Sequence, residues 1–351
     1  MFDYGSAAAT KTRFAPWKEM ENRSHLWDRF VPFSEDLLPE VWPVHYFSNV
    51  RDPTKPARLG PQFDWGPLPD SEQSGMSEEQ VCVAVAEFLD SNPPEPFFCA
   101  AGLWKPHLPW YAPQRFFDLY ALDRISLPFV KADDLDDVPA VAKSWAQRLP
   151  NHETILAHGQ WRHAVQAYLA SISYCDSVVD RIVEALGRSK ARDVTLVVLW
   201  GDNGFHLGEK LHWRKFVLWE EATRVPVIMV PSRLEKWSAR APVPVSFIDI
   251  FPSLFEMIGL PLPDEIEGES LLRFMRATGA AGKHPAVSTW RRGNHSIRVD
   301  DWRYTRYADG GEELYDQDAD PYEWNNLIGD PRFEDVRRSL REFVPRDIKV
   351  S

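Results

Sequence analysis

The chain has 351 residues, of which 44% are hydrophobic and 26% charged, and its formal net charge is −12. This composition is typical of a globular protein with a large core, organised as one large domain or as one large and one small domain. The acidic balance argues against a nucleic-acid binder, because the phosphate backbone requires a basic surface. An anionic ligand would therefore need a local cluster of cations.

The sequence predicts neither a membrane span nor a signal peptide. No window approaches about 18 uninterrupted apolar residues. The first ten residues lack a basic segment followed by an apolar one. The three cysteines, Cys82, Cys99 and Cys175, lack metal-site spacing and are expected to be buried free thiols. The compartment is left unknown.

The first half of the chain predicts an irregular segment followed by two helices. Residues 1–75 are rich in Pro, Trp and charge, and we expect them to wrap over the surface. Ser77-Glu-Glu-Gln80 is a capping signature and predicts a helix to about Asp90. The apolar run 96–102 predicts a buried strand. After loops, an amphipathic pattern predicts a long helix over about 160–186, ended by Gly187.

The second half predicts a sheet and a small final subdomain. Residues 194–200 and 225–230 are apolar strands, and the β-α-β-α order predicts an α/β fold with a mostly parallel sheet between helices. Residues 302–315 predict a hairpin, and about 331–344 predict a last helix, which together indicate a C-terminal antiparallel α+β subdomain. We therefore expect three parts: a wrapping segment (1–75), a partial catalytic domain (76–283) and the subdomain (284–351).

Two strand ends carry polar groups that could form a site. Asp202-Asn203 follows the strand at 194–200 and supplies hard oxygen atoms that suit Ca²⁺ or Mg²⁺, although Asp-Asn-Gly is also a common turn. Lys215 follows twelve residues after Asn203 and could bind an anion. His107 lies between two prolines after the strand at 96–102 and could transfer a proton, although such a histidine is often structural.

Several segments, in order over about residues 75–330, resemble the iduronate-2-sulfatase-like type I sulfatases of the alkaline-phosphatase superfamily. They are Lys105-Pro-His-Leu-Pro109, Gly201-Asp-Asn-Gly-Phe-His-Leu-Gly-Glu209, Trp213-Arg-Lys215, Glu220-Glu-Ala-Thr-Arg-Val-Pro226, Asp249-Ile-Phe-Pro-Ser-Leu-Phe, Glu313-Leu-Tyr-Asp316 and Asp320-Pro-Tyr-Glu-Trp-Asn-Asn-Leu327. The resemblance implies a parallel sheet between helices, a small C-terminal sheet, and hydrolysis of sulfate esters of saccharides.

The resemblance also implies site residues and cofactors. In this family Ca²⁺ is held partly by a pair that corresponds to Asp202 and Asn203, and a Cys or Ser in a C/S-x-P/A-x-R motif is oxidised to formylglycine. Lys215 and His107 match the residues that bind the sulfate and assist the leaving group. Residues on segments expected to rim this pocket are Trp104, Lys105, Trp110, Tyr111, His206, Trp290 and Arg291. They could contact a sugar and its carboxylate, or they could serve ordinary packing.

The chain departs from the family pattern at the nucleophile. None of the three cysteines is followed by x-Pro-Ser-Arg, and Pro231-Ser-Arg233 has Met229 at the nucleophile's position. We therefore expect an N-terminally truncated sulfatase that is inactive alone and exposes apolar sheet edges. A phosphodiesterase or phosphonate hydrolase of the same superfamily and a non-catalytic pseudoenzyme remain alternatives. Relatives of this kind are usually periplasmic, secreted or lysosomal.

Overall fold

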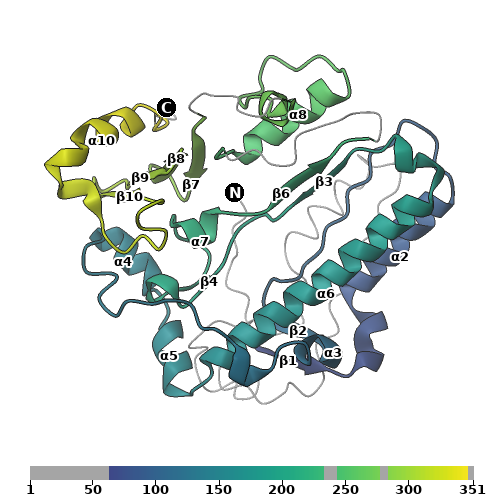
Figure 1. Ribbon diagram of the computed structural model, residues 1–351, viewed down its shortest axis with the longest axis horizontal. Helices are drawn as coiled ribbons and strands as arrows, with labels where there is room; N and C mark the ends of the chain where they lie inside the picture. Colours follow the sequence, from purple (N-terminus) through teal and green to yellow (C-terminus); the bar gives the residue numbers. More distant parts are fainter. Residues whose placement is uncertain (1–62, 233–242, 277–283, 347–351) are drawn as a thin grey trace. The chain divides into compact units, whose positions relative to one another are not determined.

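The structure is a computed structural model that describes residues 63–232, 243–276 and 284–346 (Figure 1). These residues form two compact units that alternate along the chain. Unit 1 contains the described residues up to Leu127 together with Glu153–Arg192. Unit 2 contains Pro128–His152 and the described residues from Asp193 onward. Nothing in the described part is a helix long and apolar enough to cross a bilayer.

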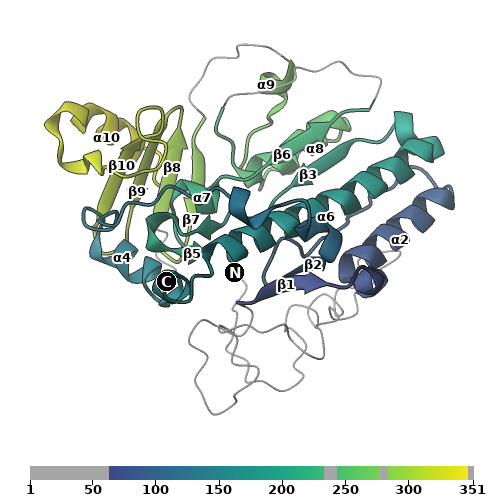
Figure 2. The ribbon, with the colours of Figure 1, turned by 60° about the horizontal axis from the view of Figure 1, so that its bottom comes forward.

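Unit 1 is built on two long helices, α2 (Ser77–Asp90) and α6 (Trp161–Arg188), which lie side by side (Figures 1 and 2). Val81, Val85 and Leu89 of α2 pack with Ala185 of α6 in an apolar cluster. Both predicted helices are confirmed. The long one runs to Arg188, past the predicted end at Gly187, because the α-helical bonds continue to the last turn.

A parallel pair of short strands, β1 (Trp65–Leu68) and β2 (Trp110–Pro113), packs against α6 and is followed by α3 (Gln114–Phe117). The predicted strand at 96–102 is wrong, since these residues are mostly exposed coil and Phe98 is 75% exposed. No strand in the described ranges pairs with this run, so its backbone has no ladder to join. Cys99 is consequently exposed rather than buried.

Unit 2 contains the strands β3 (Val197–Trp200) and β6 (Val227–Val230), which pair antiparallel with Val197 opposite Val230. The strands are present as predicted, but this pair is not parallel. Their apolar side chains are only partly covered, because Trp200, Ile228 and Val230 are each about half exposed. The exposed apolar strands that we expected are therefore present within the described residues.

The C-terminal subdomain is an antiparallel sheet in the order β10-β9-β8-β7, as predicted (Figure 2). Its strands are β7 (Ala286–Thr289), β8 (His295–Val299), β9 (Trp302–Arg306) and β10 (Glu312–Asp316). Gly310 has a φ of 93° in the hairpin turn, where a side chain would be strained. The last helix, α10 (Glu334–Arg341), packs on β9 and is shorter than predicted because Pro331–Phe333 forms a 3-10 turn.

The remaining helices and strands are short and lie along the chain between the elements described above. They are α4 (Ala140–Ala146), α5 (Asn151–Ala157), β4 (His206–Leu207), β5 (Trp213–Arg214), α7 (Glu220–Thr223), α8 (Ile250–Met257) and α9 (Leu272–Arg276). The predicted division at 75 and 283 stays a prediction, and most of the wrapping segment 1–75 lies outside the described residues. Residues 128–152 and 209–223 share an apolar core with Tyr307 and Tyr315 of the C-terminal sheet, which places them in one unit.

A buried ion network joins the C-terminal sheet to α7. Arg303 on β9 is 3% exposed and contacts the carboxylates of Glu220 on α7 and of Glu323, the latter at 2.8 Å. Glu323 also accepts a hydrogen bond from the backbone of Glu220 at 2.9 Å. Beside it, Lys210 donates to Asp134 at 2.7 Å and to the carbonyl of Glu323. Buried charges of this kind are tolerated only while each keeps its partner.

Replacing Arg303 with methionine (Arg303→Met) leaves the buried Glu220 and Glu323 carboxylates without their cation. We expect the free energy of unfolding to fall by about 3–5 kcal/mol. Urea denaturation of the full chain measures the loss. The control is Arg338→Met on α10, which removes a 70% exposed guanidinium and is expected to cost less than about 1 kcal/mol. A loss below about 1 kcal/mol for Arg303→Met would contradict the role given to the network.

Candidate functional site

The loop after β3 and the loop after β5 meet at Asn203 and Lys215. Lys215 Nζ donates to Asn203 Oδ1 at 2.8 Å, and Asn203 Nδ2 donates to the carbonyl of Gly204 at 2.8 Å. A Cβ at Gly204 would lie 2.0 Å from the carbonyl of Glu221, so only glycine allows this close approach. Two of the predicted site residues are therefore in direct contact, and Asp202 precedes them as an exposed carboxylate.

Lys215 is a half-buried cation. Burial lowers the pKa of its ammonium group, and the charge of Asp202 acts in the opposite direction. No carboxylate lies within 4.0 Å of Lys215 Nζ in the described part of the chain, where this group donates a hydrogen bond to the neutral Asn203 amide. A partly desolvated lysine with an amide partner is suited to bind an anion.

The backbone around Lys215 is held in an unusual conformation. Lys210, Arg214 and Phe216 have φ values of 54°, 82° and 77°, a region that residues with a side chain rarely adopt. His212 fixes this segment, because its two ring nitrogens lie 3.0 Å from the carbonyl oxygens of Ala146 and Lys215. Burial lowers the pKa of His212, and the contacts with these two carbonyl groups act in the opposite direction. The loop is thereby tied to the end of α4.

His206 and Glu209 support the same loop from inside. His206 is fully buried, its Nδ1 lies 3.1 Å from the carbonyl of Glu209, and burial holds its pKa well below the ordinary value. Glu209 Oε2 accepts from the backbone of Leu207 at 2.6 Å, and burial raises its pKa to about 7. His206, predicted as a substrate contact, thus has a structural position, because its ring is enclosed by the protein.

The predicted residues of unit 1 lie around His107. Its ring is 4.3 Å from that of Trp104, and Nδ1 lies 2.6 Å from the carbonyl of Leu108, which also accepts from Trp104 Nε1 at 3.3 Å. Because the carbonyl can only accept, Nδ1 carries the proton of the neutral ring. His107 and Lys215 belong to different units.

Lys105, Trp110 and Tyr111 are buried in unit 1, each below 5% exposure. Lys105 Nζ donates to the carbonyl of Pro109 at 2.7 Å, and its backbone nitrogen donates to Glu78 at 3.0 Å. Trp110 Nε1 donates to the carbonyl of Pro106 at 2.9 Å. These contacts close the turn that carries His107. The three residues were predicted as substrate contacts, but their burial gives them a structural position.

Arg291 lies in unit 2 with a group of aromatic rings. Its guanidinium is 5.8 Å from the ring of Trp145 and 5.9 Å from that of Trp290. Trp290 in turn lies 5.0 Å from Phe216, the neighbour of Lys215. The structure therefore brings the predicted Arg291 to the side of the Lys215 loop. Trp145 was missed by the sequence analysis, because its proximity depends on the tertiary fold.

Asp202 and Asn203 do not by themselves complete a cation site. Ca²⁺ takes six to eight oxygen ligands, and the Asn203 oxygen already accepts from Lys215. Within the residues that the structure describes, no group of three His, Cys, Asp or Glu side chains is placed to hold a metal. The described residues thus do not fit the implied cation.

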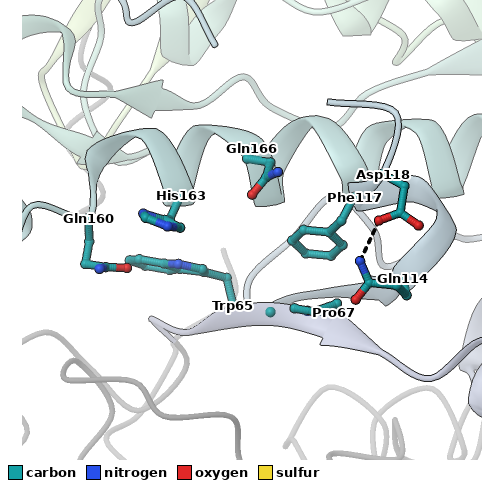
Figure 3. A pocket seen from close by; sticks show the side chains of 9 residues that line it. Trp65, Pro67, Gln114, Phe117, Asp118, Gln160, His163 and Gln166 are labelled. Carbon is teal, nitrogen blue, oxygen red and sulfur yellow. Dashed lines mark hydrogen bonds between the residues drawn. The ribbon is translucent and has the colours of Figure 1, made fainter. Parts of the chain in front are cut away.

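An open hollow of about 220 Å³ lies in unit 1 between β1 and the start of α6 (Figure 3). Figure 3 shows Trp65, Gln160 and His163 at one end and Phe117 at the other, where Gln114 donates to Asp118 at 2.7 Å. None of the predicted site residues lines this hollow. It is therefore distinct from the candidate residues.

The raised pKa of Glu209 predicts a pH-dependent stability. The folded-state value of about 7 lies above the ordinary 4.5, so between these two pH values the unfolded chain loses a proton that the folded chain keeps. Wild-type stability therefore falls over this range. Glu209→Gln cannot ionise, and we expect it to gain up to about 3 kcal/mol relative to wild type between pH 4.5 and 7.

Urea denaturation at pH 5 and pH 8 measures this gain. The control is Glu184→Gln, which removes a 59% exposed carboxyl on α6 and should show no such change between the two pH values. A constant difference between Glu209→Gln and wild type at both pH values would show that Glu209 is ionised in the folded protein throughout.

Comparison with known proteins identifies the fold. The structure is similar to a putative sulfatase from Bacteroides thetaiotaomicron, with a TM-score of 0.60 and 22% identity, covering 80% of this chain and 66% of the other. It is also similar to a phosphonate monoester hydrolase from Silicibacter pomeroyi, with a TM-score of 0.65 and 18% identity, covering 94% and 67%. At these identities the likeness concerns the fold alone, and it confirms the predicted α/β class.

The sequence has curated relatives. A sulfatase of Formosa agariphila is 36% identical over 285 residues, which are 81% of this chain and 56% of that protein. A choline-sulfatase of Rhizobium meliloti is 26% identical, covering 92% and 66%, and human iduronate 2-sulfatase is 26% identical, covering 78% and 64%. The chain thus spans between half and two thirds of the length of these relatives.

Family patterns cover most of the chain. Residues 208–349 match a family described as N-sulphoglucosamine sulphohydrolase, C-terminal. Residues 24–260, more than half of the chain, match the family described as Sulfatase. The protein therefore belongs to the sulfatase family, of the type I, alkaline-phosphatase-like kind expected from its sequence.

Proposed function

We propose that this chain carries the sulfate-binding part of a hydrolase of saccharide sulfate esters, in which Lys215 binds the sulfate group. The observation that carries the proposal is the environment of Lys215, a half-buried ammonium group that donates a hydrogen bond to the neutral Asn203 side chain in a loop with positive φ values. Family membership supports the chemical class of the ligand. Relatives named as ulvan-active sulfatase and Delta 4,5-hexuronate-2-O-sulfatase support a saccharide.

Lys215 would act on the charge of the ester. In sulfate ester hydrolysis the S–O bond to the sugar breaks, and negative charge is spread over the sulfate oxygens and the departing oxygen. At about 4 Å and an effective dielectric near 20, one cation–anion pair is worth roughly 4 kcal/mol before desolvation. In a chain with a net charge of −12, this local cation supplies an attraction that the overall field does not.

In the complete enzyme His107 would act as a proton donor, the role that the family pattern implies for it. Its Nδ1 lies 2.6 Å from the carbonyl oxygen of Leu108 and donates to it. The Trp104 ring beside it and the carbonyl together restrict the orientation of the imidazole. This contact with two fixed groups lowers the entropic cost of placing the proton.

The 351 residues contain no Cys-x-Pro-Ser-Arg segment, and Cys82, Cys99 and Cys175 lie in other contexts. Formylglycine chemistry is therefore not assigned to any of them. We propose that the chain alone binds sulfated saccharides without hydrolysing them. Sequence identity of 36% with a sulfatase favours sulfate over phosphonate esters, and the structural likeness to phosphonate hydrolases at 18% identity concerns the fold only.

Replacing Lys215 with alanine tests the proposal. Lys215→Ala is expected to raise the dissociation constant for glucose 2-sulfate by about 10-fold or more, because removing the charge pair costs about 1.4 kcal/mol or more of binding free energy. Titration calorimetry or ligand-observed NMR on the full chain measures the constant. The control is Lys143→Ala, which removes a 42% exposed ammonium on α4 paired with Asp136 and should leave binding unchanged.

A second readout addresses turnover. The purified chain is expected to release no inorganic sulfate from glucose 2-sulfate above the buffer background. Unchanged binding in Lys215→Ala would overturn the assigned sulfate site. Sulfate release that depends on Lys215 and His107 would instead overturn the proposal that the chain alone does not hydrolyse the ester.

A further inference from the structure

We propose that the hollow between β1 and the start of α6 binds one uncharged sugar ring. Its volume of about 220 Å³ is below the roughly 300–1,000 Å³ of pockets for drug-sized ligands, so it suits a ligand of about one sugar ring. The residues that line it belong to unit 1, whereas Lys215 lies in unit 2. The inference therefore goes beyond the proposed sulfate site and adds a second binding site.

Apolar side chains form two sides of the hollow (Figure 3). Trp65 and Pro67 lie on the same face of β1, because alternate residues of a strand point to one side, and Phe117 of α3 lies at the other end. Such rings provide an apolar surface for the C–H face of a sugar. Trp65 and Phe117 are only 2% and 6% exposed, so a ligand would meet part of each ring, and the polar groups would supply the specific contacts.

The aromatic side of the hollow is held in place from behind. The ring of Trp65 lies 5.7 Å from that of Phe63 and 6.0 Å from that of Trp110. Trp110 in turn lies 5.4 Å from Tyr168 on α6. A surface that is fixed before the ligand arrives keeps the entropic cost of binding low.

Two glutamines offer amide oxygens to a ligand. Gln166 Nε2 donates to the carbonyl of Tyr120 at 2.7 Å, and Gln114 Nε2 donates to Asp118 Oδ1 at 2.7 Å. A carbonyl and an ionised carboxylate only accept, so each amide turns its nitrogen to this partner and keeps its oxygen as an acceptor. Figure 3 shows Gln166 above the hollow, between His163 and Phe117. With Asp118 these groups make the hollow rich in hydrogen-bond acceptors.

This lining favours hydroxyl groups over charged groups. Hydroxyl groups donate to amide and carboxylate oxygens, and they also accept from an N–H group such as that of a histidine ring. Among the described residues that line the hollow there is neither a lysine nor an arginine, and the Asp118 carboxylate would repel an anion. Asp118 already accepts from Gln114, and neutral amides outnumber it, so an uncharged ligand is also favoured over a cationic one.

Binding of uncharged methyl glycosides to the full chain tests the site. Saturation-transfer NMR measures the dissociation constants for methyl glucoside and for methyl galactoside and methyl mannoside, each of which differs from it at one hydroxyl group. We expect saturable binding of at least one of the three. The 6-sulfate and the 2-amino counterparts of the preferred sugar are expected to bind about 5-fold more weakly or worse, because each places a charge in a lining built for hydroxyl groups.

Two variants remove single acceptors from the hollow. Gln166→Leu and Asp118→Ala are each expected to raise the dissociation constant for the preferred methyl glycoside by about 5-fold, the loss of about one hydrogen bond. Asp118 is exposed at the end of α3, so its replacement leaves the core intact. The control Gln147→Leu makes the same change at an exposed glutamine outside the hollow and should bind like wild type. Circular dichroism spectra that match wild type would show that the variants fold.

The outcomes separate this site from the sulfate site. Lys215→Ala should bind the methyl glycoside as wild type does, and weaker binding would show that the sugar occupies the Lys215 site instead. The hollow site is overturned if wild type binds none of the three glycosides, or if Gln166→Leu and Asp118→Ala bind as tightly as wild type. Tighter binding of the 6-sulfate or the 2-amino counterpart would assign the hollow to a charged ligand and likewise overturn the proposal. In each case the test of Lys215 with glucose 2-sulfate stands on its own result.

Discussion

The buried contact of Arg303 with Glu220 and Glu323 is the interaction on which unit 2 depends. Arg303 lies on β9, Glu220 begins α7, and Glu323 follows the last strand, so one guanidinium connects the C-terminal sheet to the end of the loop that carries Lys215. Lys210 adds a second buried charge from the same loop, bonded to Asp134 and to the carbonyl of Glu323. Since an unpaired buried charge is costly, these partners hold the loop in one arrangement.

That arrangement explains how Lys215 can remain poorly paired. The loop 209–216 contains positive φ values at Lys210, Leu211, Arg214 and Phe216, which cost free energy locally. The buried ion pairs at one end and the two carbonyl contacts of His212 at the other offset this cost. The outcome is a cation whose partner is an amide, and whose neighbours Phe216 and Arg214 are presented by a constrained backbone. The proposed sulfate site is therefore held in place from both ends of this loop.

The net charge of the chain and the local pairing of its charged residues differ at the Lys215 loop. A net charge of −12 would repel a polyanionic saccharide, yet Lys215 is paired with an amide and no carboxylate lies within 4.0 Å of its ammonium group in the described residues. Elsewhere in unit 2 several acidic residues do pair with arginines, as Glu312 does with Arg337. A cation without a carboxylate partner can thus give an acidic protein a local site for an anion. The overall negative charge would at the same time weaken the binding of unspecific polyanions.

The sequence by itself determined the family, both long helices and the C-terminal hairpin, because these depend on local periodicity, turn residues and ordered motifs. It singled out Asn203 and Lys215 as separate candidates, and the tertiary structure showed that they are in contact. Only the tertiary structure decided the rest. Residues 96–102 have strand-like composition but no partner strand in the described ranges, and β3 pairs antiparallel with β6, since pairing depends on neighbours rather than on local pattern. Lys105, Trp110 and His206 are buried and have structural positions, whereas Lys215 is only half buried. Packing brought Trp145 to Arg291. Solvent exposure and long-range proximity are set by the whole fold.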